Sequence, residues 1–136
     1  SINANYVYWR LADVYLLRAE CAAKIGDTSM AVTDLNKIRT RAGATAYPAS
    51  GESDLKKAIF HEREREFLLE NDSRYYDILR NGYYKTELSG KFPTLTAADL
   101  AGGALCLPIP ASAQRDKDGK VINGLILQRP YWFRYM

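Results

Sequence analysis

This sequence has few of the side chains from which metal centres and nucleophilic active sites are built. Its 136 residues include one histidine, His61, and two cysteines, Cys21 and Cys106. None of the three stands at zinc-ligand spacing, and the His-Glu pair at His61 has no second histidine after it. A serine or cysteine triad would have to use His61, and no glycine-rich phosphate loop is present. The sequence therefore predicts neither a cofactor nor a metal site.

Two kinds of run are also missing, a basic one and an apolar one long enough to span a bilayer. The formal net charge is +3, and Lys and Arg are interspersed with Asp and Glu, so we expect no nucleic-acid partner. There is no N-terminal Met and no signal peptide, and an apolar helical pattern begins almost at once. We expect a piece of a longer protein, whose upstream part would hold any targeting signal.

The rest of the composition is ordinary for a globular domain, with 47% hydrophobic and 26% charged residues. This length predicts a single domain over residues 1–136. Cys21 and Cys106 both lie in apolar surroundings, which favours buried thiols. A disulfide between them stays open.

Hydrophobic spacing predicts a helical part over residues 6–82. The first helix, about Tyr6–Ile25, is apolar nearly all round, which is typical of a buried helix and predicts packing against helices outside this sequence. Its narrow polar stripe consists of Arg10, Asp13, Glu20 and Lys24. Gly26 would end this helix, Asp27 or Thr28 would cap a second one, and Gly43 would end that.

The first two predicted helices form an antiparallel hairpin, because only a tight Gly-Asp turn separates them. Small residues at Ala19, Gly26 and Ala31, with the large Leu35, resemble part of a tetratricopeptide unit. Only one such unit can be traced. A third helix is expected from a cap at Ser53 to about Glu70, and a fourth from Asp72 or Ser73 to about Asn81.

Residues 83–136 have a different character. Gly, Pro and Thr become frequent, and helical periodicity fades apart from one expected turn at Thr96–Leu100. We expect a long, mostly irregular wrap around the helices. The sequence thus predicts an all-α protein of tetratricopeptide-like helical hairpins followed by this wrap.

The segment 62–80 is dense in charge where an apolar core face should continue from Leu55, Ala58 and Ile59. Carboxylates on an inward face need partners, because an unpaired buried charge is very costly. The segment therefore reads either as a structural ion-pair network clasping the third and fourth helices or as an active site. A glycoside hydrolase using Glu62 and Glu66 is the enzymatic alternative. The network interpretation is favoured and comprises Glu62, Arg63, Glu66, Glu70, Arg74, Asp77 and Arg80, with Arg65 as a further cation.

Aromatic residues supply the candidates for ligand contact. Aromatic faces stack on the apolar C–H groups of sugar rings, and Tyr hydroxyls add directional hydrogen bonds. The alternative is that these side chains pack the wrap onto the helices. The candidates, which lie outside the strongest helical patterns, are Tyr83, Tyr84, Trp132 and Tyr135.

Several spaced motifs, in order, resemble the C-terminal portion of SusD/RagB-type proteins. The helical part has Arg10-Leu-Ala-Asp-Val-Tyr-Leu-Leu-Arg-Ala-Glu20 and Leu35-Asn-Lys-Ile-Arg-Thr-Arg-Ala-Gly43, then Glu62-Arg63-x-x-Glu66-Phe and Glu70-Asn-x-x-Arg74-x-x-Asp77-Ile-Leu-Arg80-x-Gly82. The wrap has Leu107-Pro-Ile-Pro110 and Gln128-x-Pro130. The resemblance covers most of the chain.

This resemblance implies an all-helical fold and a protein that is not an enzyme. It implies a surface lipoprotein of the outer membrane of a Bacteroidetes-type bacterium, with its lipid anchor upstream of this sequence. Such proteins bind glycans, or in some members peptides, and partner a SusC-like TonB-dependent transporter. A tetratricopeptide-type scaffold that binds only protein is the alternative from the residues alone.

The chain departs from the family pattern at two places in the wrap. Ala113 follows Ser112 where the family usually has Glu, and the ending is Gln128-Arg129-Pro130-Tyr131-Trp132. Both changes concern local turns. The family's sugar-contacting residues vary and lie largely in the part that would precede Ser1, so the resemblance assigns no binding residue here.

Overall fold

The computed structural model describes residues 7–49, 51–70, 73–88 and 94–135, and within these ranges every regular element is a helix. The all-α prediction is confirmed. The chain divides into two compact units, residues 1–81 and 82–136, which are described separately below. The expectations of one domain and of a wrap around the helices stay predictions.

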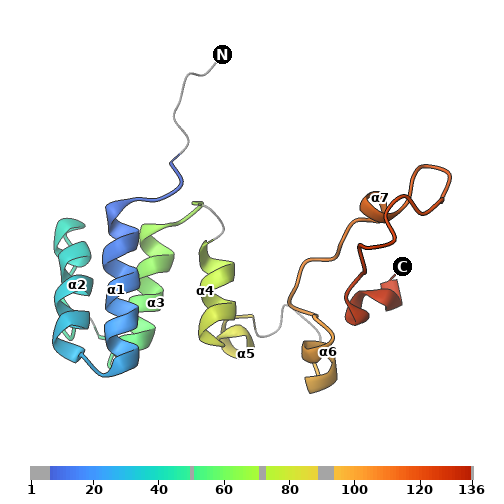
Figure 1. The fold of residues 1–136 in the computed structure, drawn as a ribbon. Coiled ribbons are helices and arrows are strands. Elements are labelled where there is room, and N and C mark those ends of the chain that lie inside the picture. Colours follow the sequence, from blue (N-terminus) through green and yellow to red (C-terminus); the bar gives the residue numbers. More distant parts are fainter. Residues whose placement is uncertain (1–6, 50, 71–72, 89–93, 136) are drawn as a thin grey trace, which may run out of the picture. The chain divides into compact units, whose positions relative to one another are not determined.

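The first unit contains α1 (Leu11–Ile25), α2 (Thr28–Arg41), α3 (Leu55–Glu66) and α4 (Ser73–Asn81). Figure 1 shows α1 between α2 and α3, and α1 packs on both while α3 packs on α4. Gly26 ends α1 with φ 88°, a left-handed conformation that glycine adopts without strain. The Asp27 side chain then accepts a hydrogen bond from Met30 N and caps α2.

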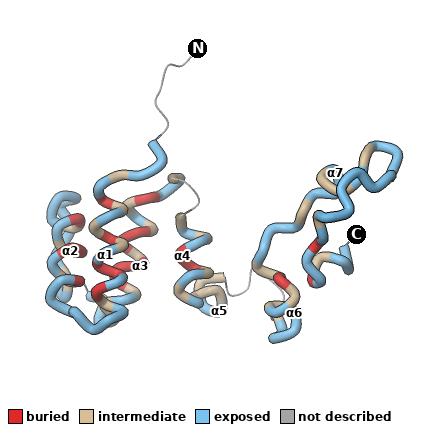
Figure 2. Tube along the Cα trace, viewed as in Figure 1, coloured by how far each residue is buried: buried red, intermediate tan, exposed pale blue. Residues whose placement is uncertain are grey.

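A tight hairpin of α1 and α2 forms because small residues face each other. Ala19 and Ala31 are fully buried, so the two backbones can approach closely, and Leu35 and Leu16 fill the remaining space. Ile59 and Phe67 extend this core onto the third helix and the turn after it. Figure 2 shows the buried residues concentrated on the inward faces of α1, α2 and α3.

Three predicted helix boundaries are wrong. Residues 7–10 are not helical, and Arg10 has extended backbone with its guanidinium bound to Glu66 and Glu70. Asp54, not Ser53, caps α3 by accepting from Lys56 N and Lys57 N. That helix ends at Glu66 rather than about Glu70, because Leu69 has φ 64°, outside the helical region. Of the two predicted caps for α4, Asp72 lies outside the described residues.

Within this chain α1 is not buried all round, and its predicted packing against helices outside this sequence stays a prediction. Leu11, Val14, Cys21 and Ile25 share one face and are exposed to solvent, Ile25 by 82%. The opposite face carries Ala12, Leu16 and Ala19 and is buried against the other helices. The first helix therefore buries one apolar face in this chain and exposes another apolar face to solvent.

The described residues of the second unit contain the short helices α5 (Tyr84–Glu87), α6 (Ala97–Ala101) and α7 (Ala111–Gln114), and the 3-10 helix η1 (Pro130–Tyr135). The predicted turn at Thr96–Leu100 is confirmed by α6, which begins with a capping box between Thr96 and Asp99. Gly102 follows it, and Tyr131 N donates to Gly102 O over 3.0 Å. A side chain at Gly102 would lie 3.2 Å from that nitrogen, which is why glycine fits there.

Candidate functional site

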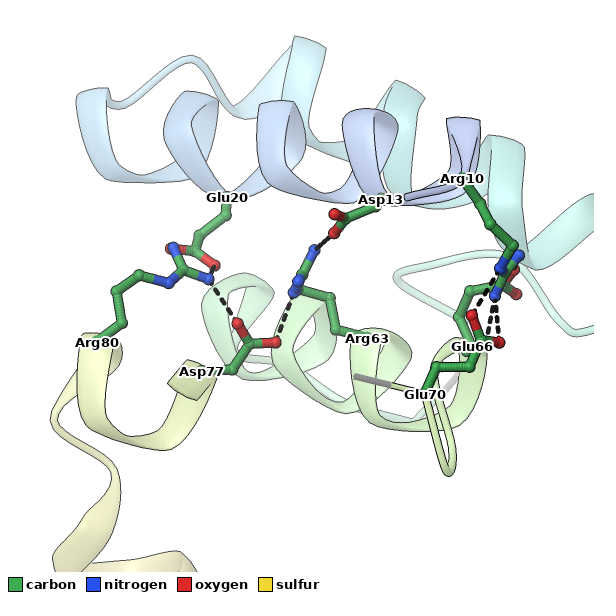
Figure 3. Close-up of polar contacts among 8 residues, drawn as sticks. All are labelled: Arg10, Asp13, Glu20, Arg63, Glu66, Glu70, Asp77 and Arg80. Atoms are coloured by element: carbon green, nitrogen blue, oxygen red, sulfur yellow. Dashed lines mark hydrogen bonds and ion pairs between the residues drawn. The ribbon is translucent and has the colours of Figure 1, made fainter. Parts of the chain in front are cut away.

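The charged segment found in the sequence is centred on a buried arginine. Arg63 on α3 is 4% exposed, and its Nε donates to Asp77 Oδ2 of α4 over 2.6 Å. Its Nη1 donates to Asp13 Oδ1 of α1 over 2.7 Å. Figure 3 shows Arg63 between these two carboxylates. One guanidinium thus ties three helices together.

Arg80 continues this line of charges. Its Nη2 donates to Asp77 Oδ1 over 2.7 Å and to Glu20 Oε2 over 2.9 Å, so a chain of ion pairs runs from Asp13 to Glu20 (Figure 3). Burial alone would raise the pKa of Glu20, but hydrogen bonds from Lys24 and Arg80 outweigh it and hold that pKa below its usual value.

A second cluster joins the start of α1 to the end of α3. Arg10 Nη1 donates to Glu66 Oε1 over 2.6 Å, and Arg10 Nε donates to Glu70 Oε2 over 2.9 Å. Arg41 of α2 also binds Glu66 over 2.6 Å. Burial opposes ionisation of Glu66, but the two arginines hold its pKa below the usual value, and hydrogen bonds to Glu70 and Glu66 raise the pKa of Arg10.

Glu62 is the third buried carboxylate of α3. It is 3% exposed and accepts from Arg39 of α2 over 2.5 Å and from Arg65 over 2.7 Å. Arg74 of α4 pairs instead with the more exposed Glu64. Each residue of the proposed network thus has an ionic partner within the helical unit.

The pairing differs from the expected clasp of the third and fourth helices, because the first two helices supply many of the partners. Sequence reasoning missed Arg39 and Arg41 of α2 as partners and gave the polar stripe of α1 no role. Three residues of that stripe, Arg10, Asp13 and Glu20, bind the charges of α3 and α4. The sequence feature that could have identified these partners is the stripe of polar residues on an otherwise apolar helix.

This pairing does not suit acid–base chemistry. A glycosidase needs one carboxylic acid whose pKa is raised so that it can donate a proton. The pKa of Glu66 is lowered instead, and both Glu62 and Glu66 are each bound by two arginines. His61 is paired with Glu52 over 2.7 Å, and no group of metal-ligating side chains occurs among the described residues.

A pocket of about 180 Å³ opens beside the network on the same unit. Its lining includes Arg10, Asp13, Arg63, Glu70 and Asp77, which are members of the two ion-pair clusters. The remaining lining is mostly aromatic, with Phe67 buried and three rings exposed to solvent: Tyr8, Trp9 and Tyr76. Sequence reasoning did not select Trp9 or Tyr76 for binding.

The four aromatic candidates from the sequence all lie in the second unit. Trp132 and Tyr135 come together in η1, with ring centroids 5.8 Å apart and Tyr131 beside both. Trp132 Nε1 donates to Cys106 O over 2.8 Å, which gives this ring a structural contact. Tyr83 and Tyr84 lie elsewhere, at the start of α5, and both are half-buried.

The prediction of buried thiols is wrong. Cys21 and Cys106 are both free and exposed. Cys21 is exposed because it lies on the outward face of α1, opposite the core residues Ala19 and Ala22. Cys106 is in a turn whose carbonyl, rather than its side chain, contacts Trp132.

These observations describe a helical protein whose buried carboxylates are paired with arginines rather than available for catalysis. Comparison with known proteins is consistent with that class. Residues 1–103 match the sequence model of the SusD family, and the chain belongs to this family. SusD-type proteins are non-catalytic binding proteins.

One curated relative is the "SusD-like protein P25" of Formosa agariphila. It is 38% identical over 82 residues, which cover 57% of this chain but only 15% of that protein. No solved structure gave a significant match. Within the described residues, no helix combines the length and apolar character needed to cross a membrane.

Proposed function

We propose that this chain is part of a nutrient-binding protein that captures glycans at the bacterial outer membrane. The observation that carries the proposal is the SusD-family match over residues 1–103. Such a protein would be a surface-exposed lipoprotein, anchored by a lipid upstream of this sequence. It would pass its ligand to a SusC-like TonB-dependent transporter.

Binding without catalysis agrees with the chemistry of the helical unit. Glu62, Glu66 and Asp77 are held by arginines in fixed geometry, so they serve the fold rather than bond cleavage. Capture would then rest on shape, aromatic stacking and hydrogen bonds. Several sites on one transporter complex would raise the avidity for a polymer.

The experiment is affinity electrophoresis of the whole protein in gels that contain neutral and acidic polysaccharides, with casein peptides as the non-glycan arm. Retardation by at least one polysaccharide is expected. Retention by none of them would overturn glycan capture, and binding to peptides alone would assign the protein to the peptide-binding members. Tyr135→Ala in the same gels tests one of the four aromatic candidates from the sequence, since this ring is 64% exposed. Weaker retardation by the polysaccharide would support its role in binding.

Partnership with the transporter has its own test. The whole protein should co-purify from detergent-solubilised outer membranes with a TonB-dependent transporter and should be accessible to protease on intact cells. Recovery in the soluble fraction without any transporter would overturn both the location and the partner.

A protein-binding scaffold is the second candidate, favoured by the exposed apolar face of α1. Leu11, Val14 and Ile25 are between 59% and 82% exposed, and such faces mark contact surfaces. A protein partner lost in Val14→Asp, together with no retention by any glycan, would favour the scaffold.

A further inference from the structure

The pocket of the first unit combines exposed rings with charges that are already paired. Phe67, 7% exposed, lies under the Arg10 guanidinium at 4.9 Å and the Arg63 guanidinium at 5.2 Å from its ring centroid. Trp9, which is 81% exposed, and Tyr76, which is 59% exposed, also line this pocket. Large exposed rings in the lining of a pocket are suited to stacking on a ligand.

Paired charges determine which ligand chemistry fits. The lining holds two guanidinium groups and three carboxylates, a net charge of −1. Both guanidinium groups already bind carboxylates, Arg63 those of Asp13 and Asp77. An anionic ligand would meet this net negative charge, and any arginine that gave up its carboxylate to bind the ligand would leave that carboxylate unpaired, at a cost in free energy.

Hydroxyl groups meet no such obstacle. An ionised carboxylate offers about four acceptor positions, so Asp13 and Glu70 can accept hydroxyl protons while they keep their arginines. A sugar ring offers such hydroxyls at its edge and apolar C–H groups on its face, which match the carboxylates and the exposed rings respectively.

We propose that this pocket is a subsite for one pyranose unit of a neutral glycan, with Trp9 and Tyr76 as the stacking residues. Pockets for drug-sized ligands measure roughly 300–1,000 Å³, so about 180 Å³ suits a single sugar unit of a chain that extends beyond it. The proposal rests on glycan capture as the function and adds the place and the charge class of the ligand.

Calorimetric titration of the whole protein tests the subsite. The neutral probes are maltohexaose, cellohexaose, xylohexaose, laminarihexaose and mannohexaose, and the anionic probes are a hexagalacturonate and a heparin hexasaccharide. At least one neutral probe should bind, and Trp9→Ala and Tyr76→Ala should each raise its Kd about tenfold or more. Ile25→Ala is the matched control, because Ile25 is 82% exposed, as Trp9 is by 81%, and lies at the opposite end of α1 from Trp9.

Hydrogen exchange gives a second measurement that needs no variant. Saturating neutral probe should slow exchange of the amides near Trp9 and Tyr76 and leave those near Ile25 unchanged. Unchanged binding in both variants, or binding of anionic probes alone, would overturn the subsite while glycan capture stands. A wild-type protein that binds none of the probes or polysaccharides would overturn both.

Discussion

Different interactions stabilise the interior of each of the two units of this chain. In residues 7–81 a continuous apolar core of Leu16, Leu35 and Ile59 is bordered by buried ion pairs. In the described part of residues 82–136 the buried side chains are those of Tyr131 and Gln128. Leu107, Leu125 and Leu127 of the second unit are at least 76% exposed.

In the second unit, hydrogen bonds from glutamine side chains to the backbone join segments that share little apolar core. Gln128 pairs with both backbone groups of Ile109, accepting from its N over 3.2 Å and donating to its O over 2.8 Å. Gln114 Nε2 donates to Ile126 O over 2.7 Å. The irregular segments of the second unit are therefore held by hydrogen bonds at a few backbone groups. This predicts lower local stability than in the helical unit.

The largest effect should come from removing the central cation of the first unit. Arg63→Met leaves Asp13 and Asp77 without their buried partner and should cost about 3–5 kcal/mol of unfolding free energy. Arg74→Met is the matched control, because Arg74 pairs with the more exposed Glu64, and it should cost about 1 kcal/mol or less. Urea unfolding of the whole protein measures both, and equal costs would contradict the buried-network interpretation.

Core truncation compares the units directly. Leu16→Ala removes a fully buried side chain and should destabilise by about 2–5 kcal/mol. Leu125→Ala removes a side chain that is 94% exposed and should change stability by about 0.5 kcal/mol or less. A large loss for Leu125→Ala in urea unfolding would mean that the second unit buries this residue against something else.

A single amide should matter in the second unit. Gln128→Met keeps the length of the side chain but loses both hydrogen bonds to Ile109, at a local cost of about 1–3 kcal/mol. Hydrogen exchange of the Ile109 and Leu107 amides should accelerate, whereas exchange in α1 should not. Uniform acceleration across both units would contradict their separate stabilisation.

The smallest expected loss of stability comes from acidification, because protonation removes the charge of a carboxylate without removing the side chain. The pKa values of Glu20 and Glu66 are lowered by their cationic partners, so these carboxylates add stability that is fully present above about pH 4.5. That stability is lost as the pH falls through their lowered pKa values. The melting temperature should therefore drop below about pH 4.5, and a melting temperature that stays constant or rises down to pH 3 would contradict the pairing.

The helical hairpin could be predicted because it follows from a local pattern, and the density of charge in residues 62–80 is likewise visible in the sequence. Gly26-Asp27 marks the turn, and the arginines and carboxylates of 62–80 are close along the chain. The sequence could not show that Arg10 lies beside Glu66, 56 residues away, or that Leu69 breaks the helix. The pocket depends on those long-range contacts, so its aromatic residues could not be selected from spacing alone.

The most direct test of the account is the stability of Glu66→Gln, because Glu66 is a residue that either an active site or a structural network could use. Glu66 is bound by Arg10 and Arg41, so the substitution should lower the unfolding free energy by about 1–3 kcal/mol in the urea titration. Glu64→Gln on the same helix is the control and should cost less. We expect this loss of stability together with no glycan hydrolysis by the wild type. Unchanged stability together with a lost hydrolytic activity would contradict the structural role of Glu66.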